Sequence, residues 1–337
     1  MASNDVIAGM EPVTLAQFES LTTDGATKVM INTIRKYMPF FDRAVFATAS
    51  DGTRDVGRVI TSYPKGQARA YNEGWGTEYA TGKQVAYETS MYRTRSIIDW
   101  DQYRHKGKKA AAWRLSQDQA MEMGMAREMV HRCFYGDNSD GRSMQGIANI
   151  VVPGETWKDQ IISAGGTTDN KQGEIYIISW DQTDTHLTVP QNVSAPGLFI
   201  DVSNKPELVM DTNGKEFRGL VTEAGWDLGI SLFNPRKVVR ITNIDTTKLS
   251  ANTKTGPNLI SLLTKGMNRL DKMEGATSIY MNENMLSWLQ LQIQEKSNVM
   301  YNQRNIGDRL VDVWGTTPIY MLGNDVLSDE NKVLKID

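Results

Sequence analysis

The most constraining feature of the sequence is a long amphipathic segment between residues 115 and 136. An apolar side chain recurs there every four residues, at Met121, Met125, Met129 and Cys133. This spacing places the four on one face of a helix, where they form an apolar stripe. Ser116 and Gln119 have the spacing of a capping box, and Gly136 is a typical stop. We therefore expect a helix over 116–135 that packs on a sheet or another helix and organises the surrounding elements.

Residues 46–96 predict a ribbon that has no obvious partner within the chain. Apolar and polar residues alternate from Gln84 to Met91, which is the period of a half-exposed strand, and Gly57–Tyr63 is a plausible earlier strand. The stretch 64–82 between them contains five glycines or prolines and predicts a loose tip. Because an isolated two-stranded ribbon is only marginally stable in water, we expect it to lie on a neighbouring subunit.

The remaining elements fall into three groups. An extended N-terminal arm carries short helices, predicted at 15–21 and 26–37. Long antiparallel strands are predicted at 174–180, 186–190, 217–233 and 237–244. The last part alternates helix and strand, with helices at 259–270 and after Asn282 or Asn284, and strands at 277–281, 310–314 and 318–322. The whole pattern is that of an α+β protein.

Composition narrows the class of protein. The chain has 337 residues, 40% of them hydrophobic and 23% charged, so it can form more than one compact unit. A net charge of −3 gives no global basic field that would point to nucleic acid. There is no signal-peptide pattern, and no run approaches the ~20 apolar residues of a membrane span. Since Cys133 is the only cysteine, we expect a buried thiol in a reducing compartment, in a soluble protein that is intracellular when made.

Residues 92–114 are locally basic, with seven cations against Asp99 and Asp101 and a balance of +5. The cations are Arg93, Arg95, Arg104, Lys106, Lys108, Lys109 and Arg114. Three interpretations stay open: a solvated connection into the helix, intersubunit ion pairing, and contact with phosphates. The candidate DNA-facing or intersubunit cluster consists of Arg104, Lys106, Lys108, Lys109 and Arg114.

No catalytic, cofactor-binding or metal-binding residues are predicted. The chain has three histidines, His105, His131 and His186, which nothing in the sequence groups together. The segment 137–142 resembles the start of a calcium loop, but Gly141 stands where an oxygen ligand is needed, so we expect a surface turn. With no phosphate loop, dinucleotide fingerprint or nucleophile elbow, the chain is not expected to be an enzyme or to bind a cofactor.

Several stretches, taken together, resemble one protein family. They are Ala112–Ala120, Cys133–Asp137, Met144–Ile147, Trp226–Leu232, Val238–Asp245, Ile279–Asn282 and Trp314–Ile319. In type and order they are similar to stretches of the major capsid proteins of tailed bacteriophages, which have the HK97-type fold, and most closely to a podovirus-like subfamily. No single stretch is a specific motif, but the ordered set is, and it spans residues 30 to 325.

The resemblance implies a particular division of the chain. It comprises an N-terminal arm (1–45), an E-loop hairpin (46–96), a spine helix that begins the peripheral domain (97–150), a long-strand peripheral sheet (151–245) and an axial domain (246–337). In the familiar arrangement, a long peripheral hairpin follows the strand that matches Ile319, whereas this sequence stops at Asp337. The best candidate for that hairpin is 174–244, so we expect a permuted strand order in which 174–244 lies away from the capsomer centre.

The resemblance also implies a function. A major capsid protein self-assembles into pentamers and hexamers of an icosahedral shell, which encloses double-stranded phage DNA without sequence-specific binding. It is made in the cytoplasm of the host bacterium, works with a portal and possibly a decoration protein, and contacts no membrane. No large scaffolding domain precedes the arm, which suggests a separate scaffolding protein.

Two alternatives stay open at this point. An encapsulin-type cellular compartment shares the fold and would hold cargo rather than DNA. A β-rich carbohydrate-binding or hydrolytic protein would need an aromatic platform or paired carboxylates, which the eight scattered tryptophans do not clearly supply.

Overall fold

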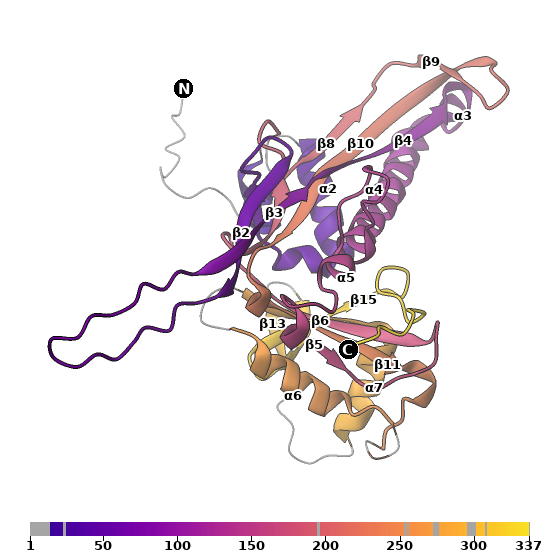
Figure 1. Cartoon of the computed structure of the whole chain (residues 1–337). Coiled ribbons are helices and arrows are strands. Elements are labelled where there is room, and N and C mark those ends of the chain that lie inside the picture. The colour runs from indigo at the N-terminus through magenta and orange to yellow at the C-terminus, as the bar shows by residue number, and fades with distance from the viewer. Residues whose placement is uncertain are drawn as a thin grey trace.

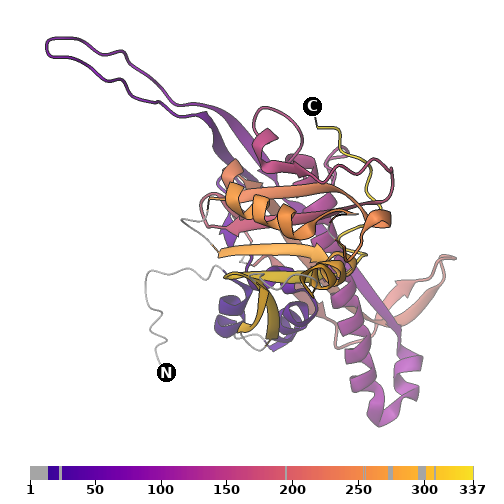
Figure 2. The ribbon, with the colours of Figure 1, turned by 90° about the horizontal axis from the view of Figure 1, so that it is seen from below.

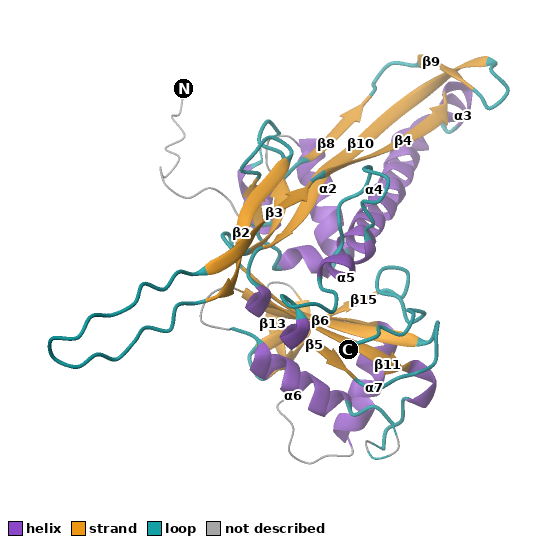
Figure 3. Cartoon of the chain, in the orientation of Figure 1, coloured by secondary structure: helices purple, strands orange, loops and turns teal. Residues whose placement is uncertain are grey.

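The computed structural model describes residues 14–22, 25–193, 196–252, 254, 256–271, 276–294, 301–306 and 309–336. Two main β-sheets, each with its own helices, lie one above the other, and a thin hairpin projects from the side (Figure 1). Helices and strands are mixed along the chain (Figure 3), as expected for an α+β protein. None of the helices in these ranges combines the length and the apolar character that crossing a bilayer requires.

The six-stranded sheet is built around β10, a strand of 17 residues. Its strands are β1 (Phe46–Thr48), β4 (Ser90–Asp99), β7 (Thr185–Val189), β8 (Leu198–Val202), β9 (Glu207–Met210) and β10 (Glu216–Leu232). β4 pairs with one edge of β10, β8 and β9 pair with the other, and β7 pairs with its last four residues. The 26-residue helix α4 (Ala110–Tyr135) runs along one face of β4 and β10 (Figure 1).

Every second side chain of β10 faces α4, because successive side chains of a strand point to opposite sides of the sheet. The buried row under the helix is Leu220, Thr222, Ala224, Trp226 and Leu228. Helices α1 (Leu15–Leu21) and α2 (Gly25–Tyr37) complete this core. The bounds of both helices agree with the sequence prediction to within one residue.

The seven-stranded sheet has helices α6 (Leu259–Arg269) and α7 (Glu283–Gln294) on one face. Its strands, in spatial order, are β13 (Tyr301–Ile306), β14 (Arg309–Trp314), β15 (Thr317–Leu322), β12 (Ala276–Asn282), β6 (Gln172–Trp180), β11 (Val238–Asp245) and β5 (Ile161–Ser163). Asn258 caps α6 by accepting from the amide of Ser261, and Asn282 accepts from the amide of Met285 at the start of α7. The second of these caps is one of the two predicted.

An aromatic cluster joins the two sheets. Phe40, in the short helix η1 (Pro39–Asp42), lies 5.4 Å from Phe134 of α4, 5.5 Å from Trp180 and 5.1 Å from Tyr280, measured between ring centroids. Trp180 also donates to the hydroxyl of Tyr280 at 2.8 Å. Because these rings come from the arm, α4 and both central strands of the second sheet, the two sheets share one core.

Short elements connect these layers. They are α3 (Trp100–His105), α5 (Ile147–Ile150), η2 (Gly107–Lys109), η3 (Lys158–Gln160), η4 (Pro235–Lys237) and η5 (Thr246–Lys248). The hairpin strands are β2 (Arg54–Ser62) and β3 (Thr81–Glu88).

The predicted start of the long helix is wrong. α4 begins at Ala110, and Ser116 lies inside it, where its hydroxyl donates to the carbonyl of Trp113 at 2.8 Å instead of capping the helix. The run Ala110–Ala112 favours helix strongly, so the helix extends back to the turn η2. The predicted apolar stripe is confirmed from Met125 to Cys133, which are buried in the core.

The prediction of one peripheral sheet over 151–245 is also wrong. β6 and β11 pair with each other, and β6 pairs with β12, so both belong to the seven-stranded sheet. Within 151–245, only the segment from β7 to β10 belongs to the six-stranded sheet, the sheet on which α4 packs. Apolar strands of both sheets read alike in sequence, and their partners lie far along the chain, so the pattern alone could not separate them.

The N-terminal arm and the hairpin both differ from the prediction. The described part of 1–45 is packed rather than extended, since Leu15, Met30, Ile34 and Phe40 are all fully buried. The projecting hairpin covers 54–88, whereas β1 and β4 on either side of it are strands of the six-stranded sheet.

Candidate assembly surfaces

The hairpin is anchored at its base and free beyond it. In the described part of the chain, β2 and β3 pair with each other and with no third strand. At the base, His186 Nε2 lies 2.8 Å from the carboxylate of Asp55, and the hydroxyl of Tyr87 donates to the carbonyl of Leu232 at 2.8 Å. A Cβ at Gly57 would overlap the ring of Phe233, so glycine lets the hairpin lie directly on that ring. Figures 1 and 2 show how far the rest extends from the body.

The anchor is electrostatic as well as steric. Burial opposes ionisation of Asp55, but hydrogen bonds from His186 and Ser231 outweigh it and hold the pKa of Asp55 below its usual value. The anchor therefore contains a carboxylate, not a neutral acid, at neutral pH.

The tip of the hairpin, residues 63–80, exposes four aromatic side chains. The exposed fractions are 61% for Tyr63, 98% for Tyr71, 70% for Trp75 and 80% for Tyr79. Exposed aromatic side chains that gather in one place mark an interaction surface.

Side-chain hydrogen bonds hold the tip in shape where the strand ladder has ended. Glu78 accepts from the amide of Lys65 at 2.8 Å and from the side chain of Gln67 at 3.2 Å, and Gln67 accepts from the amide of Gly76 at 3.1 Å. Arg69 lies 5.0 Å from the ring centroid of Trp75, in a cation–π contact. Glu73, Glu78 and Arg69 thus bond within the tip, and the aromatic rings are exposed to solvent.

The basic segment 92–114 does not form one cluster. Arg93 and Arg95 pair with Asp227 and Glu223 on the sheet face away from α4. Arg104 lies 3.4 Å from Asp101, both exposed. Lys106, Lys108 and Lys109 are exposed at the turn between α3 and α4, at the end of the molecule farthest from the seven-stranded sheet (Figure 1).

Arg114 does not belong with the other candidate cations. It is 9% exposed, and its guanidinium donates to the carbonyl of Ser203 at 2.8 Å, to the carbonyl of Val221 at 3.2 Å and to the hydroxyl of Thr222 at 3.0 Å. The prediction that Arg114 faces DNA or a neighbouring subunit is therefore wrong. The structure leaves Arg104, Lys106, Lys108 and Lys109 as an exposed group, named here the basic tip.

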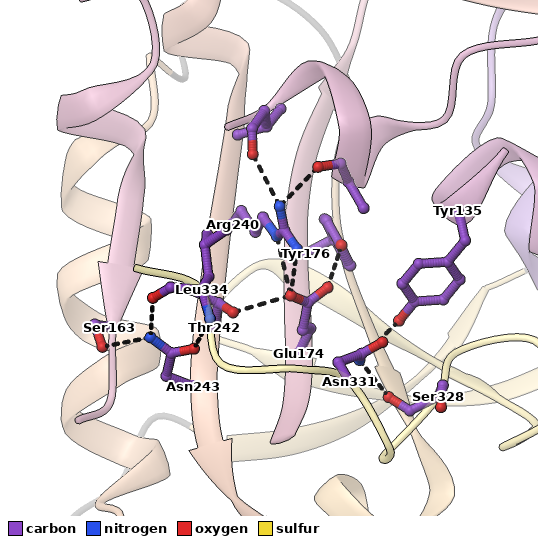
Figure 4. Close-up of polar contacts among 12 residues, drawn as sticks. Tyr135, Ser163, Glu174, Tyr176, Arg240, Thr242, Asn243, Ser328, Asn331 and Leu334 are labelled. Atoms are coloured by element: carbon purple, nitrogen blue, oxygen red, sulfur yellow. Dashed lines mark hydrogen bonds and ion pairs between the residues drawn. The ribbon is translucent and has the colours of Figure 1, made fainter. Parts of the chain in front are cut away.

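A buried ionic joint, which the sequence analysis did not predict, connects the seven-stranded sheet to the segment that follows α4 (Figure 4). Glu174 of β6 accepts from Arg240 of β11, and also from Thr242 at 2.9 Å and from the hydroxyl of Tyr176. Arg240 also donates to the carbonyls of Ala148 at 2.8 Å and Val151 at 3.0 Å, which follow α4 in the chain. The joint therefore fixes the end of the α4 segment onto the second sheet.

The C-terminal segment is fastened beside this joint (Figure 4). The side chain of Asn243 donates to the carbonyl of Leu334 and accepts from its amide, both at 2.8 Å. Asn331 donates to the hydroxyl of Tyr135, the last residue of α4, at 3.2 Å. Asn243 adopts a φ of 58°, a conformation that asparagine tolerates better than most residues. The signal available in the sequence is an asparagine inside the apolar run Val238–Asp245.

The described residues include few candidates for a reactive group. Among the described residues, no three metal-binding side chains lie together. Burial raises the pKa of the Cys133 thiol, which is the opposite of what a reactive cysteine needs. Asp137 accepts from the amide of Ser139 and Asp140 from that of Arg142, so 137–142 forms the expected surface turns.

Known proteins resemble this chain in sequence and in fold. A model of the family described as major capsid protein GP7 matches residues 22–334. Among solved structures, the chain is similar to one from bacteriophage epsilon15, with 24% identity and a TM-score of 0.61, over 87% of this chain and 88% of that one. It is also similar to the bacteriophage JBD30 capsid, with 11% identity and a TM-score of 0.48, over 94% and 100% of the two chains. The SrpI encapsulin of Synechococcus elongatus is more distant, with 10% identity and a TM-score of 0.38, over 73% and 97%. No protein with a curated function matches.

Two sheets joined at a shared core, a long helix along one of them and a projecting hairpin define the HK97-like capsid fold, which the epsilon15 chain shares. The chain belongs to the major capsid protein GP7 family. It is therefore a structural protein that forms the capsid shell of a bacteriophage, and its place is the virion. This confirms the predicted family, fold class and shell-forming function, and it favours a structural role over the carbohydrate-binding or hydrolytic alternative.

Proposed function

We propose that the subunit assembles into pentamers and hexamers that close into an icosahedral shell around double-stranded DNA. The observation that carries this proposal is the hairpin 54–88, whose aromatic tip is not covered by any described part of its own chain. A surface of this kind needs a neighbour, and repeated contacts between unlike surfaces generate closed rings. Many such contacts acting together make a shell far more stable than any one pair.

The two sheets take different places in this proposal. The six-stranded sheet with α4 forms the peripheral domain, and the seven-stranded sheet with α6 and α7 forms the axial domain at the capsomer centre. The hairpin crosses to the adjacent subunit. This arrangement limits the predicted peripheral hairpin to β7–β10, which lies in the chain between the axial strands β6 and β11 rather than before all of them.

The basic tip serves as an intersubunit contact in this proposal. It lies at the end of α3, which contacts β10, and β9 on the same sheet exposes Leu208 and Met210 by 70% and 67%. A surface that mixes apolar and charged groups suits a protein partner. The double variant Lys108→Glu/Lys109→Glu should then fail at assembly. Shells that assemble but lose their DNA would instead assign the tip to DNA phosphates.

The proposal is tested by producing the chain together with a scaffolding protein, in the host cytoplasm, and imaging the product by negative-stain microscopy. Rings and closed shells are expected for the wild-type chain, and Trp75→Ala should abolish them while the subunit keeps its melting temperature. Trp75→Phe is the matched control and should assemble, because it keeps an aromatic ring. Only small single particles from the wild-type chain would overturn the proposal, and protein cargo in place of DNA would favour the encapsulin-type alternative.

A further inference from the structure

The face of α4 against the six-stranded sheet carries three charged side chains at intervals of one helical turn. Arg114, Asp118 and Glu122 are 9%, 7% and 4% exposed, so all three are buried. The buried positions that follow them on the helix are apolar: Met125, Ala126, Met129, Val130, Cys133 and Phe134. This row of three, named here the charged strip, takes part in none of the assembly surfaces described above.

The charged strip contains one cation and two carboxyl groups. Arg114 Nε lies 3.6 Å from Asp118 Oδ2, and the rest of the guanidinium bonds to Ser203 and β10. Oδ1 of Asp118 and Oε2 of Glu122 accept no hydrogen bond from the residues that the structure describes. Burying a carboxylate without a cation or donors costs much more than burying the neutral acid, so the strip favours binding a proton.

The proton belongs on Glu122. Arg114 lies two turns away from it along the helix, about 12 Å, whereas Asp118 is only one turn from the arginine. The nearest charged group to Glu122 on its own helix is the carboxyl of Asp118. Burial first, and that neighbouring carboxyl second, raise the pKa of Glu122 to about 7.

The pKa shift of Glu122 has two causes among the described residues, burial and Asp118, and neither is a cation. Lys28 and Lys36 of α2 are exposed, and they line a shallow hollow with Gln119, one turn before Glu122. The strand register places these side chains of β4 and β10 on the α4 side: Tyr92, Thr94, Ser96, Thr222, Ala224 and Trp226. The buried face of α2, which also contacts α4, consists of Met30, Ile31, Thr33 and Ile34. Among the side chains of the sheet and of the buried face of α2, only the hydroxyl of Tyr92 can titrate, and it carries no positive charge in either form.

We propose that Glu122 holds a proton in the folded subunit, and that losing this proton loosens the contact between α4 and the six-stranded sheet. The neutral acid fits among neutral groups. The carboxylate would stand next to Asp118 with no cation, and water entering between helix and sheet relieves that cost. The long helix of the shell subunit therefore has two states, selected by pH. This inference concerns one subunit and does not depend on the proposed interfaces.

The direction of the pH effect follows from linkage. The pKa of Glu122 in the folded subunit is about 7, above its usual value of 4.5, so the folded state binds more protons than the unfolded state between these values. The stability that Glu122 contributes is fully present below pH 4.5 and is lost as pH rises through 7. Subunits are therefore expected to be more stable at pH 5 than at pH 8 in this respect.

Glu122→Gln tests the proposal, because glutamine has the shape of the neutral acid and cannot ionise. Between pH 5 and pH 8, the melting temperature of the wild-type subunit should fall by about 5 °C more than that of Glu122→Gln. Amide hydrogens of α4 should exchange faster at pH 8 than at pH 5 in the wild type, after correction for intrinsic rates, and not in the variant. Glu128→Gln is the matched control on the same helix, since Glu128 is partly exposed and lies 2.9 Å from Arg132. It should keep the wild-type pH dependence.

Two further measurements keep the assignment falsifiable. If Glu122→Gln retains the wild-type pH dependence while Asp118→Asn loses it, the proton is on Asp118 and the proposal is wrong. If Glu122→Gln does not fold, infrared spectroscopy of the wild type decides instead. A protonated-carboxyl band present at pH 6 and lost by pH 8 is the expected result, and its absence at pH 6 overturns the proposal. Each readout uses dissociated subunits, so it is separate from any failure of shell assembly.

Discussion

The ionic joint and the charged strip both bury an arginine beside glutamate or aspartate, but they are built in opposite ways. At the joint, Glu174 is bonded to Arg240, Thr242 and Tyr176, and Arg240 also bonds to two carbonyls. In the strip, each carboxyl keeps one oxygen without a donor among the described residues. A cluster whose polar groups are all hydrogen-bonded has a single stable arrangement, whereas a cluster with an unpaired carboxyl oxygen can bind or release a proton. The subunit therefore has a rigid connection between its seven-stranded sheet and the segment after α4, and an adjustable one between α4 and the six-stranded sheet.

The largest effect is expected when the joint loses its cation. Arg240→Met leaves Glu174 buried without its charge partner, so the free energy of unfolding should fall by about 3–5 kcal/mol. Urea unfolding of the dissociated subunit measures this. The double variant Arg240→Met/Glu174→Leu should recover most of the loss, because it also removes the stranded carboxylate. A double variant as unstable as the single one would mean that the joint acts through packing rather than charge.

A smaller and pH-dependent effect is expected in the strip. Arg114→Met removes donors from three acceptors, two of them buried, and should cost about 1–3 kcal/mol. Burial already raises the pKa of Asp118, against the charge of Arg114, and without Arg114 that pKa should rise further. The loss should therefore be greater at pH 8 than at pH 5, when measured by urea unfolding at both values. Equal losses at the two pH values would remove the distinction between strip and joint.

The base of the hairpin provides a test in which packing, not charge, is changed. Gly57→Ala forces a methyl group against the ring of Phe233 and should cost about 1–3 kcal/mol of unfolding free energy. Gly74→Ala, in the hairpin tip, is the control, because a Cβ there meets no atom within 4 Å. Thermal melts of both variants would show whether the hairpin is held as firmly as the structure indicates.

The outer face of α4 supplies the smallest expected effect, with the opposite sign. Gly124 is exposed inside the helix, and a Cβ there meets nothing within 4 Å. Gly124→Ala should raise the free energy of unfolding by about 0.5–1 kcal/mol, because glycine loses more conformational freedom in a helix than alanine. If this variant is destabilising instead, the outer face of α4 packs against something, and the helix is not free on that side.

Much of the fold could be predicted because periodicity is local. The positions of α1, α2, α6 and the strands β6, β10 and β15 were predicted from the spacing of apolar residues. The hairpin was predicted from the alternation of apolar and polar residues and from the glycines and prolines between its two strands. Its need for a neighbour was inferred from the same residues, which the structure leaves exposed.

What could not be predicted depends on partners far along the chain. Nothing near β6 or β11 shows that they pair with each other across the 57 residues from 181 to 237, or that β6 also pairs with β12. Arg114 was assigned to a surface because a charged residue next to other charged residues is usually solvated. Its burial depends on Ser203 and Thr222, 89 and 108 residues away, and no short-range pattern contains that information.

The route of the backbone has a consequence for damaged particles. The chain passes between the two sheets three times, after α5, between β6 and β7, and between β10 and β11. A single cut at any of these passages leaves strands from both fragments hydrogen-bonded within at least one sheet. β4 stays paired with β10 after the first cut, and β6 with β11 after the second and third. A protease that nicks a subunit once at such a passage should therefore leave it in place, with no hole in the shell.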